Sequence, residues 1–147
     1  MLLRIGRYDV MILVSACLAG YRCRYDGAVK PDPDVSALVK SGQALPVCPE
    51  QLGGLPCPRV PAERTPDGKR VLNKEGGDVT EAFRSGAEET LRIAKLYGCK
   101  HAILKAKSPS CGLNEIYDGT FSGTLRKGNG VTVDLLLKHG ITVEGKD

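Results

Sequence analysis

The sequence predicts an α/β fold: one domain with a mostly parallel, Rossmann-like sheet flanked by helices. Short apolar runs alternate along the chain with segments that carry apolar residues at helical spacing. Strands joined by helices in this way form parallel sheets with right-handed crossovers. A length of 147 residues with 41% hydrophobic content fits a single core. We place this domain at residues 11–147, after an N-terminal extension at residues 1–10.

Four apolar runs are the predicted strands: residues 11–16, 43–47, 101–104 and 141–143. The first run contains β-branched residues and ends at Cys17. The second ends at Cys48, because Pro49 cannot continue a central strand. The third is followed by the segment that contains Cys111. Each of these three cysteines therefore lies just past the carboxyl end of a strand.

Three segments are the predicted helices: residues 33–40, 78–97 and 131–139. The longest has Asp78 as a suitable N-cap, Gly98 as its stop and a stripe formed by Val79, Phe83, Ala87, Leu91, Ala94 and Tyr97. Residues 52–68 are rich in Gly and Pro and predict an ordered functional loop. A short extended piece at residues 69–72 follows it.

Cys17, Cys48 and Cys111 are predicted to converge, although 31 and 63 residues separate them. In a parallel sheet with right-handed crossovers, the carboxyl ends of the strands lie along one edge. Loops at that edge are where such folds bind ligands. The three thiols are therefore expected at one binding site.

The chain has six cysteines, which is compatible with disulfides, buried thiols or structural zinc. Residues 14–17 resemble a lipoprotein cleavage site, but Arg7 and Asp9 leave an apolar stretch only from residue 10 to residue 14, too short for an export signal. No run is long enough to span a membrane. We expect a cytoplasmic location, where disulfides are rare.

Three thiolates gathered at one place repel one another, so a bound metal is expected. A closed zinc site needs four ligands, usually from Cys-x-x-Cys pairs, and the chain has no such pair. Three thiolates suit a [4Fe-4S] cluster with one open iron. Cys99 is expected to be a buried apolar side chain, whereas Cys23 or Cys57 is a candidate reserve ligand or sulfur acceptor.

Six motifs in order resemble those of the thiouracil desulfidase family: residues 15–18 (Ser-Ala-Cys-Leu), 23–27 (Cys-Arg-Tyr-Asp-Gly), 48–55 (Cys-Pro-Glu and Leu-Gly-Gly-Leu), 77–80 (Gly-Asp-Val-Thr), 108–112 (Ser-Pro-Ser-Cys-Gly) and 116–123 (Ile-Tyr-Asp-Gly-Thr-Phe-Ser-Gly). The resemblance implies a non-redox desulfidase in which Cys17, Cys48 and Cys111 hold a [4Fe-4S] cluster. Its fourth iron takes sulfur from a thiolated nucleobase. Cys57 and Lys107 depart from the commoner Thr and Arg of the family.

Hydrolysis of a thiocarbonyl needs a polarised sulfur and a deprotonated water. Glu50 is the predicted base, because it lies two residues after Cys48 and a shielded site raises a carboxyl pKa. The alternative is a loop carboxylate bonded to backbone amides or to Arg59. Ser108 is slightly favoured over Ser110 as a donor to substrate or water, with turn formation as the alternative for both.

Composition limits the partners. Aromatic content of 5% without Trp argues against base-stacking surfaces as the main working parts. The net charge is +4, and the cationic residues nearest the cysteines are expected to make an electropositive site mouth or a solvated surface: Arg22, Arg24, Arg59, Lys105 and Lys107. We expect a small thiolated nucleobase or nucleoside as substrate, no stable nucleic-acid complex and no membrane.

Two other classes of function stay open at this point. One is a metal-binding sensor without turnover. The other is a thiol-based sulfur carrier that uses Cys23 or Cys57. The sequence selects neither the position of sulfur in the substrate nor the oligomeric state.

Overall fold

The computed structural model describes residues 11–147, and the extension predicted at residues 1–10 lies outside them. The main sheet has four parallel strands in the order β2-β1-β5-β8. Their bounds are Ile12–Ser15 (β1), Ala44–Val47 (β2), His101–Lys105 (β5) and Thr142–Lys146 (β8). All four correspond to predicted strands, so the predicted α/β class and parallel sheet are confirmed.

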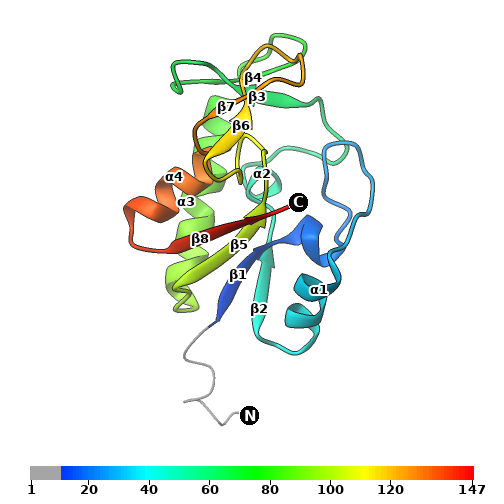
Figure 1. Ribbon diagram of the computed structural model, residues 1–147, viewed down its shortest axis with the longest axis vertical. Helices are drawn as coiled ribbons and strands as arrows, with labels where there is room; N and C mark the ends of the chain where they lie inside the picture. Colours follow the sequence, from blue (N-terminus) through cyan, green and yellow to red (C-terminus); the bar gives the residue numbers. More distant parts are fainter. Residues whose placement is uncertain (1–10) are drawn as a thin grey trace.

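Helices cover both faces of this sheet (Figure 1). Helix α1 (Pro33–Lys40) lies on one side, and α3 (Thr80–Leu96) and α4 (Val131–Lys138) lie on the other. Neighbouring residues of β1 point to opposite faces, as the alternation of a strand requires. Leu13 packs into the core that includes residues of α3 and α4, whereas Val14 packs into the core that includes Val35 of α1. The domain is thus a three-layer sandwich.

The N-terminus of α3 differs from the prediction by two residues. The helix begins at Thr80, and the Asp78 carboxylate accepts hydrogen bonds from the Thr80 backbone N–H (2.9 Å) and hydroxyl (2.6 Å). The prediction of Asp78 as the N-cap is therefore wrong, because Val79 occupies that position without a side-chain cap bond and Asp78 precedes it. The predicted apolar stripe is wrong at its end, because Tyr97 lies beyond the helix and is 52% exposed.

Residues 49–73 contain more regular structure than the predicted loop. Helix α2 (Pro49–Leu52) begins directly after Cys48, because a proline that ends a strand also suits the first turn of a helix. Strands β3 (Ala62–Arg64) and β4 (Val71–Asn73) then form an antiparallel hairpin. The prediction of a loop throughout residues 52–68 is therefore wrong at β3, whose three residues are too few to show periodicity.

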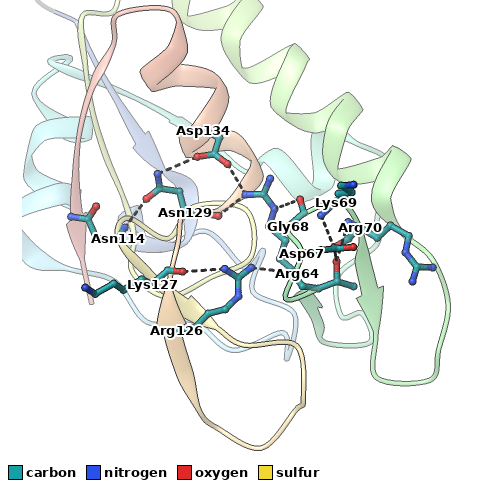
Figure 2. Close-up of polar contacts among 11 residues, drawn as sticks. Arg64, Asp67, Gly68, Lys69, Arg70, Asn114, Arg126, Lys127, Asn129 and Asp134 are labelled. Carbon is teal, nitrogen blue, oxygen red and sulfur yellow. Dashed lines mark hydrogen bonds and ion pairs between the residues drawn. The ribbon is translucent and has the colours of Figure 1, made fainter.

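A second hairpin pairs β6 (Glu115–Tyr117) with β7 (Leu125–Lys127). Both hairpins lie above the carboxyl ends of the sheet strands (Figure 1). Figure 2 shows two arginines that hold this region together. Arg64 of β3 donates to the Asn129 carbonyl and to the Asp134 carboxylate, both at 2.7 Å. Arg126 of β7 donates to the Thr65 carbonyl at 3.0 Å.

Within residues 11–147, no helix combines the length and apolar character that crossing a membrane demands.

Candidate active site

The three thiols predicted to converge border one cavity of about 530 Å³. Cys17 lies in the single 3-10 turn Ala16–Ala19 (η2) that follows β1, Cys48 is the N-cap residue of α2, and Cys111 lies in the loop after β5. Strands β1, β2 and β5 are adjacent in the sheet, so their carboxyl ends open on the same space. The predicted convergence is confirmed, whereas the role of these residues as ligands stays a prediction.

Cys23 lies between two of these thiols. It is 3% exposed, lines the cavity and forms side-chain hydrogen bonds with Cys17 and Cys48. These bonds raise the pKa of Cys23, lower that of Cys17 and lower that of Cys48 to about 6. Burial raises the pKa of Cys111 to about 12. Cys23 is thus part of the site, which the sequence indicated only as an alternative.

The other two cysteines lie elsewhere. Cys99 is 4% exposed in the core beneath α3 and α4, which confirms it as a buried apolar side chain. The Cys57 thiol contacts the carbonyl oxygens of Arg22 and Arg24 at 3.2 and 3.1 Å, and Cys57 does not line the cavity. Cys57 therefore has no direct access to the cavity that the other thiols share.

The donor set fits an iron-sulfur cluster. All the cysteines of the chain are free thiols, and four of them line the cavity, of which Cys17, Cys48 and Cys111 follow three different strands. Among the described residues, no three His, Cys, Asp or Glu side chains lie close enough to share one metal ion. A cube presents its irons at separate corners, so it does not require ligands that close. Lys105 and Arg24 lower the pKa of Cys17 and favour its thiolate form.

Glu50 projects from the first turn of α2 and lines the same cavity. Its Oε2 lies 3.3 Å from Nη2 of Arg59, and the exposed fractions of the two side chains are 18% and 6%. Burial raises the pKa of Glu50, and the attraction to Arg59 opposes that rise. Glu50, the predicted base, therefore lies at the cavity wall and also forms the ion pair with Arg59 that was its alternative role.

The two serines of the 108–112 segment differ in position. Ser108 lines the cavity, and its Oγ accepts the Cys111 backbone N–H at 2.7 Å. Its hydroxyl hydrogen has no acceptor among the described residues, so it can donate into the cavity. Ser110 is 1% exposed, bonds Thr132 at 2.8 Å and does not line the cavity. This geometry supports the choice of Ser108, which both forms the turn and keeps a donor.

Cationic side chains dominate the charged lining of the cavity, as expected for an electropositive mouth: Arg24, Lys30, Arg59, Lys74, Lys105 and Lys107. Arg22 is an exception, because it does not line the cavity and donates to the Gly27 carbonyl at 2.9 Å. Sequence reasoning missed Glu63, Tyr117 and Phe121, which also line the cavity. They come from the two hairpins, whose short strands carry no pattern that reveals which side chains face a site.

The profile of one protein family, described as 2-thiouracil desulfurase, matches residues 12–147. The chain belongs to this family. The match includes every described residue except Met11, and all six sequence motifs lie within it.

Two relatives of this family member show how far the similarity extends. An uncharacterized protein of Bacillus subtilis (strain 168), YbbK, is 45% identical over 141 residues, which are 90% of this chain and 93% of the relative. The solved structure of the [4Fe-4S]-dependent thiouracil desulfidase TudS is 46% identical and superimposes with a TM-score of 0.87. That match covers 94% of this chain and 91% of TudS.

Proposed function

We propose that this chain is a non-redox desulfidase that hydrolyses the thiocarbonyl of a thiouracil-type nucleobase to the oxo form and sulfide. The observation that carries the proposal is one cavity whose lining includes the thiols of Cys17, Cys48 and Cys111, the Glu50 carboxylate and the Ser108 hydroxyl. The family and the TudS description both support desulfidase activity, and neither favours a metal-binding sensor or a sulfur carrier.

Cys17, Cys48 and Cys111 are the proposed ligands of a [4Fe-4S] cluster. When bound, such a cluster supplies an iron with an open coordination position, a Lewis acid that attracts sulfur. The cationic lining supports the site, because Lys and Arg side chains stabilise thiolates and the negative charge of the cluster.

Glu50 is the proposed base that takes a proton from the attacking water. Its raised pKa increases its basicity, while Arg59 holds the carboxylate in place through the ion pair at 3.3 Å. Ser108 is the proposed donor that orients substrate or water. The reaction balances without electrons, since a thiocarbonyl and one water give a carbonyl and hydrogen sulfide.

The test uses protein prepared without oxygen. We expect about four irons and four inorganic sulfides per chain, and uracil with sulfide in equal amounts from 2-thiouracil, with no external reductant. In water labelled with heavy oxygen, one labelled atom should enter the product carbonyl per sulfide released. Stoichiometric zinc without iron uptake, unlabelled product or turnover that requires an electron donor would each contradict the proposal.

A cytoplasmic location is part of the proposal. It is supported by the six free cysteines of the described chain, because thiols stay reduced in that compartment. The proposed substrate is a free thiolated base or nucleoside, since the described cavity is of small-molecule size.

A further inference from the structure

Glu63 is an acidic residue held in one orientation at the wall of the cavity. It lies in the middle of β3 and is 9% exposed. Its Oε1 accepts the backbone N–H of Gly119 at 2.9 Å and that of Phe121 at 3.1 Å. Both donors belong to the turn between β6 and β7, so the carboxylate joins the two hairpins. One oxygen of Glu63 is thus fully used by the protein.

The second oxygen is free to meet a ligand. Glu63 Oε2 makes no hydrogen bond or ion pair within residues 11–147. The only fully occluded side-chain nitrogen or oxygen atoms there that lack a partner are Arg59 Nε and Arg126 Nε. Glu63 Oε2 therefore keeps contact with solvent although its residue is buried. Glu63 also lines the cavity, so its carboxylate is within reach of a molecule bound there.

Aromatic side chains line the same cavity as Glu63. Three of the seven aromatic residues of the chain do so, and two of them, Tyr117 and Phe121, come from the second hairpin and its turn. A flat ring that carries N–H groups matches apolar ring faces beside a carboxylate acceptor. We propose that Glu63 accepts a ring N–H of the thiolated base and thereby selects substrates that carry a donor at that position. This inference rests on the proposed function and adds to it a residue that reads the substrate.

The hairpins around Glu63 are braced, so its free oxygen has a fixed position. The neighbouring residue Arg64 bonds Asn129 and Asp134, and Arg126 bonds the Thr65 carbonyl (Figure 2). A binding group that is already held in place loses little conformational entropy when it meets its ligand. Glu63 is therefore suited to discriminate between ring nitrogens.

The competing explanation is that Glu63 only braces the turn. Glu63→Gln separates the two roles, because the amide oxygen can still accept both backbone N–H groups while an NH₂ donor replaces the free oxygen. A brace predicts unchanged kinetics in this variant. A substrate contact predicts a KM for 2-thiouracil raised roughly 10- to 100-fold, the range for loss of one buried charge-assisted bond, with kcat within about 3-fold.

The matched control is Glu115→Gln, which removes an exposed carboxylate from β6 of the adjacent hairpin and should leave KM unchanged. The substrates are 2-thiouracil and its 1-methyl and 3-methyl derivatives. In the wild-type protein, methylation of the nitrogen that Glu63 contacts should raise KM by a similar factor. In Glu63→Gln that discrimination should fall to less than about 3-fold, since the two changes remove the same bond.

Calorimetric binding of uracil to the cluster-loaded proteins gives a readout that does not need turnover. Wild type and Glu115→Gln should bind uracil alike, and Glu63→Gln should bind it at least about 10-fold more weakly. Equal KM, equal discrimination and equal uracil binding in Glu63→Gln would overturn the inference, as would a wild-type protein indifferent to both methyl groups. If the wild-type protein binds uracil through Glu63 but releases no sulfide from 2-thiouracil, the proposed function is wrong and the contact between Glu63 and the nucleobase is still supported.

Discussion

Gly53 at the end of α2 and Gly86 in the middle of α3 face each other at backbone contact. A Cβ on Gly53 would lie 1.9 Å from the Ala82 carbonyl oxygen, and one on Gly86 would lie 1.9 Å from that of Pro49. Only glycine permits such an approach. Because Cys48 and Glu50 sit at the start of α2, this contact fixes the position of the cavity wall that carries them.

Gly86→Ala should destabilise the protein, against the usual trend for helices. At an exposed position inside a helix, alanine stabilises the helix by about 1 kcal/mol relative to glycine. Here its methyl group would collide with the Pro49 backbone, which should cost more than about 2 kcal/mol net. Ser85→Ala, at an exposed position of the same helix, is the control and should be neutral or slightly stabilising. Urea unfolding measures both, and a Gly86→Ala protein at least as stable as wild type would refute the contact.

Cys17→Ala, Cys48→Ala and Cys111→Ala should each abolish cluster retention, because each removes a proposed ligand. Cys99→Ala should retain iron and lose about 1 kcal/mol of stability, as expected for a change in the core. Cys23→Ala is the sharper control, since Cys23 touches the site and is not a proposed ligand. Iron and sulfide content is measured after anaerobic reconstitution. If Cys23→Ala loses its iron while one of the three proposed ligand variants keeps it, the ligand assignment is wrong.

Glu50→Gln should keep the cluster and lower kcat by roughly 10² to 10⁴, the range attributed to general-base catalysis. The amide is close in size to the carboxylate but cannot take a proton from water. Sulfide release from 2-thiouracil gives the rate, and the visible spectrum reports the cluster. A variant as active as wild type would exclude Glu50 as the base, whereas a metal-binding sensor would show no turnover in either protein.

Ser108→Ala and Ser110→Ala should affect different properties. Ser108→Ala removes the hydroxyl donor at the cavity, so kcat should fall, but less than in Glu50→Gln. Ser110→Ala leaves the buried Thr132 hydroxyl without its partner and should cost about 1 to 3 kcal/mol of stability with kcat nearly unchanged. The kcat and the free energy of unfolding in urea are measured for both variants. A fall in kcat in Ser110→Ala and not in Ser108→Ala would assign the donor role to Ser110.

Asp32→Ala should lower stability by about 1 kcal/mol at neutral pH, because Asp32 is the N-cap of α1 and accepts the Asp34 and Val35 N–H groups at 3.0 Å. The Val35 bond is the main reason why its pKa is lowered in the folded protein. The contribution is therefore complete above the unfolded pKa of about 4 and is lost as pH falls through the lower folded value. The free energies of unfolding of wild type and variant should converge at acidic pH, below the folded value, and Asp34→Ala, which removes a first-turn carboxylate that caps no backbone N–H, is the control.

The main sheet and three of the helices could be predicted from the sequence, because the spacing of apolar residues shows which face of a strand or helix is buried. Residues 33–40 illustrate this: the predicted helix matches α1 at both ends, since Asp32 and Pro33 mark its start chemically. The hairpins could not be predicted, because three-residue strands such as β3 leave no periodicity to detect.

The candidate site was predictable where strand ends determine position. Cys17, Cys48 and Cys111 follow adjacent strands, so topology alone brings them to one edge. Glu63 was not predictable, because its place at the cavity depends on the packing of two hairpins and on bonds to Gly119 and Phe121, residues more than fifty positions away. Composition gives no positions: few aromatic residues are present, yet Tyr117 and Phe121 both line the cavity.

The strand order β2-β1-β5-β8 has a consequence for biosynthesis. With the proposed ligands, the first and second thiols are held by β1 and β2, but the third follows β5, which inserts beside β1 only after residue 105 has been made. A nascent chain that ends before β5 holds two of the three thiolates and lacks a strand of the sheet that positions them. With this ligand assignment, a complete set of three thiolates exists only after about three quarters of the chain has been synthesised, while α4 and β8 are still to follow.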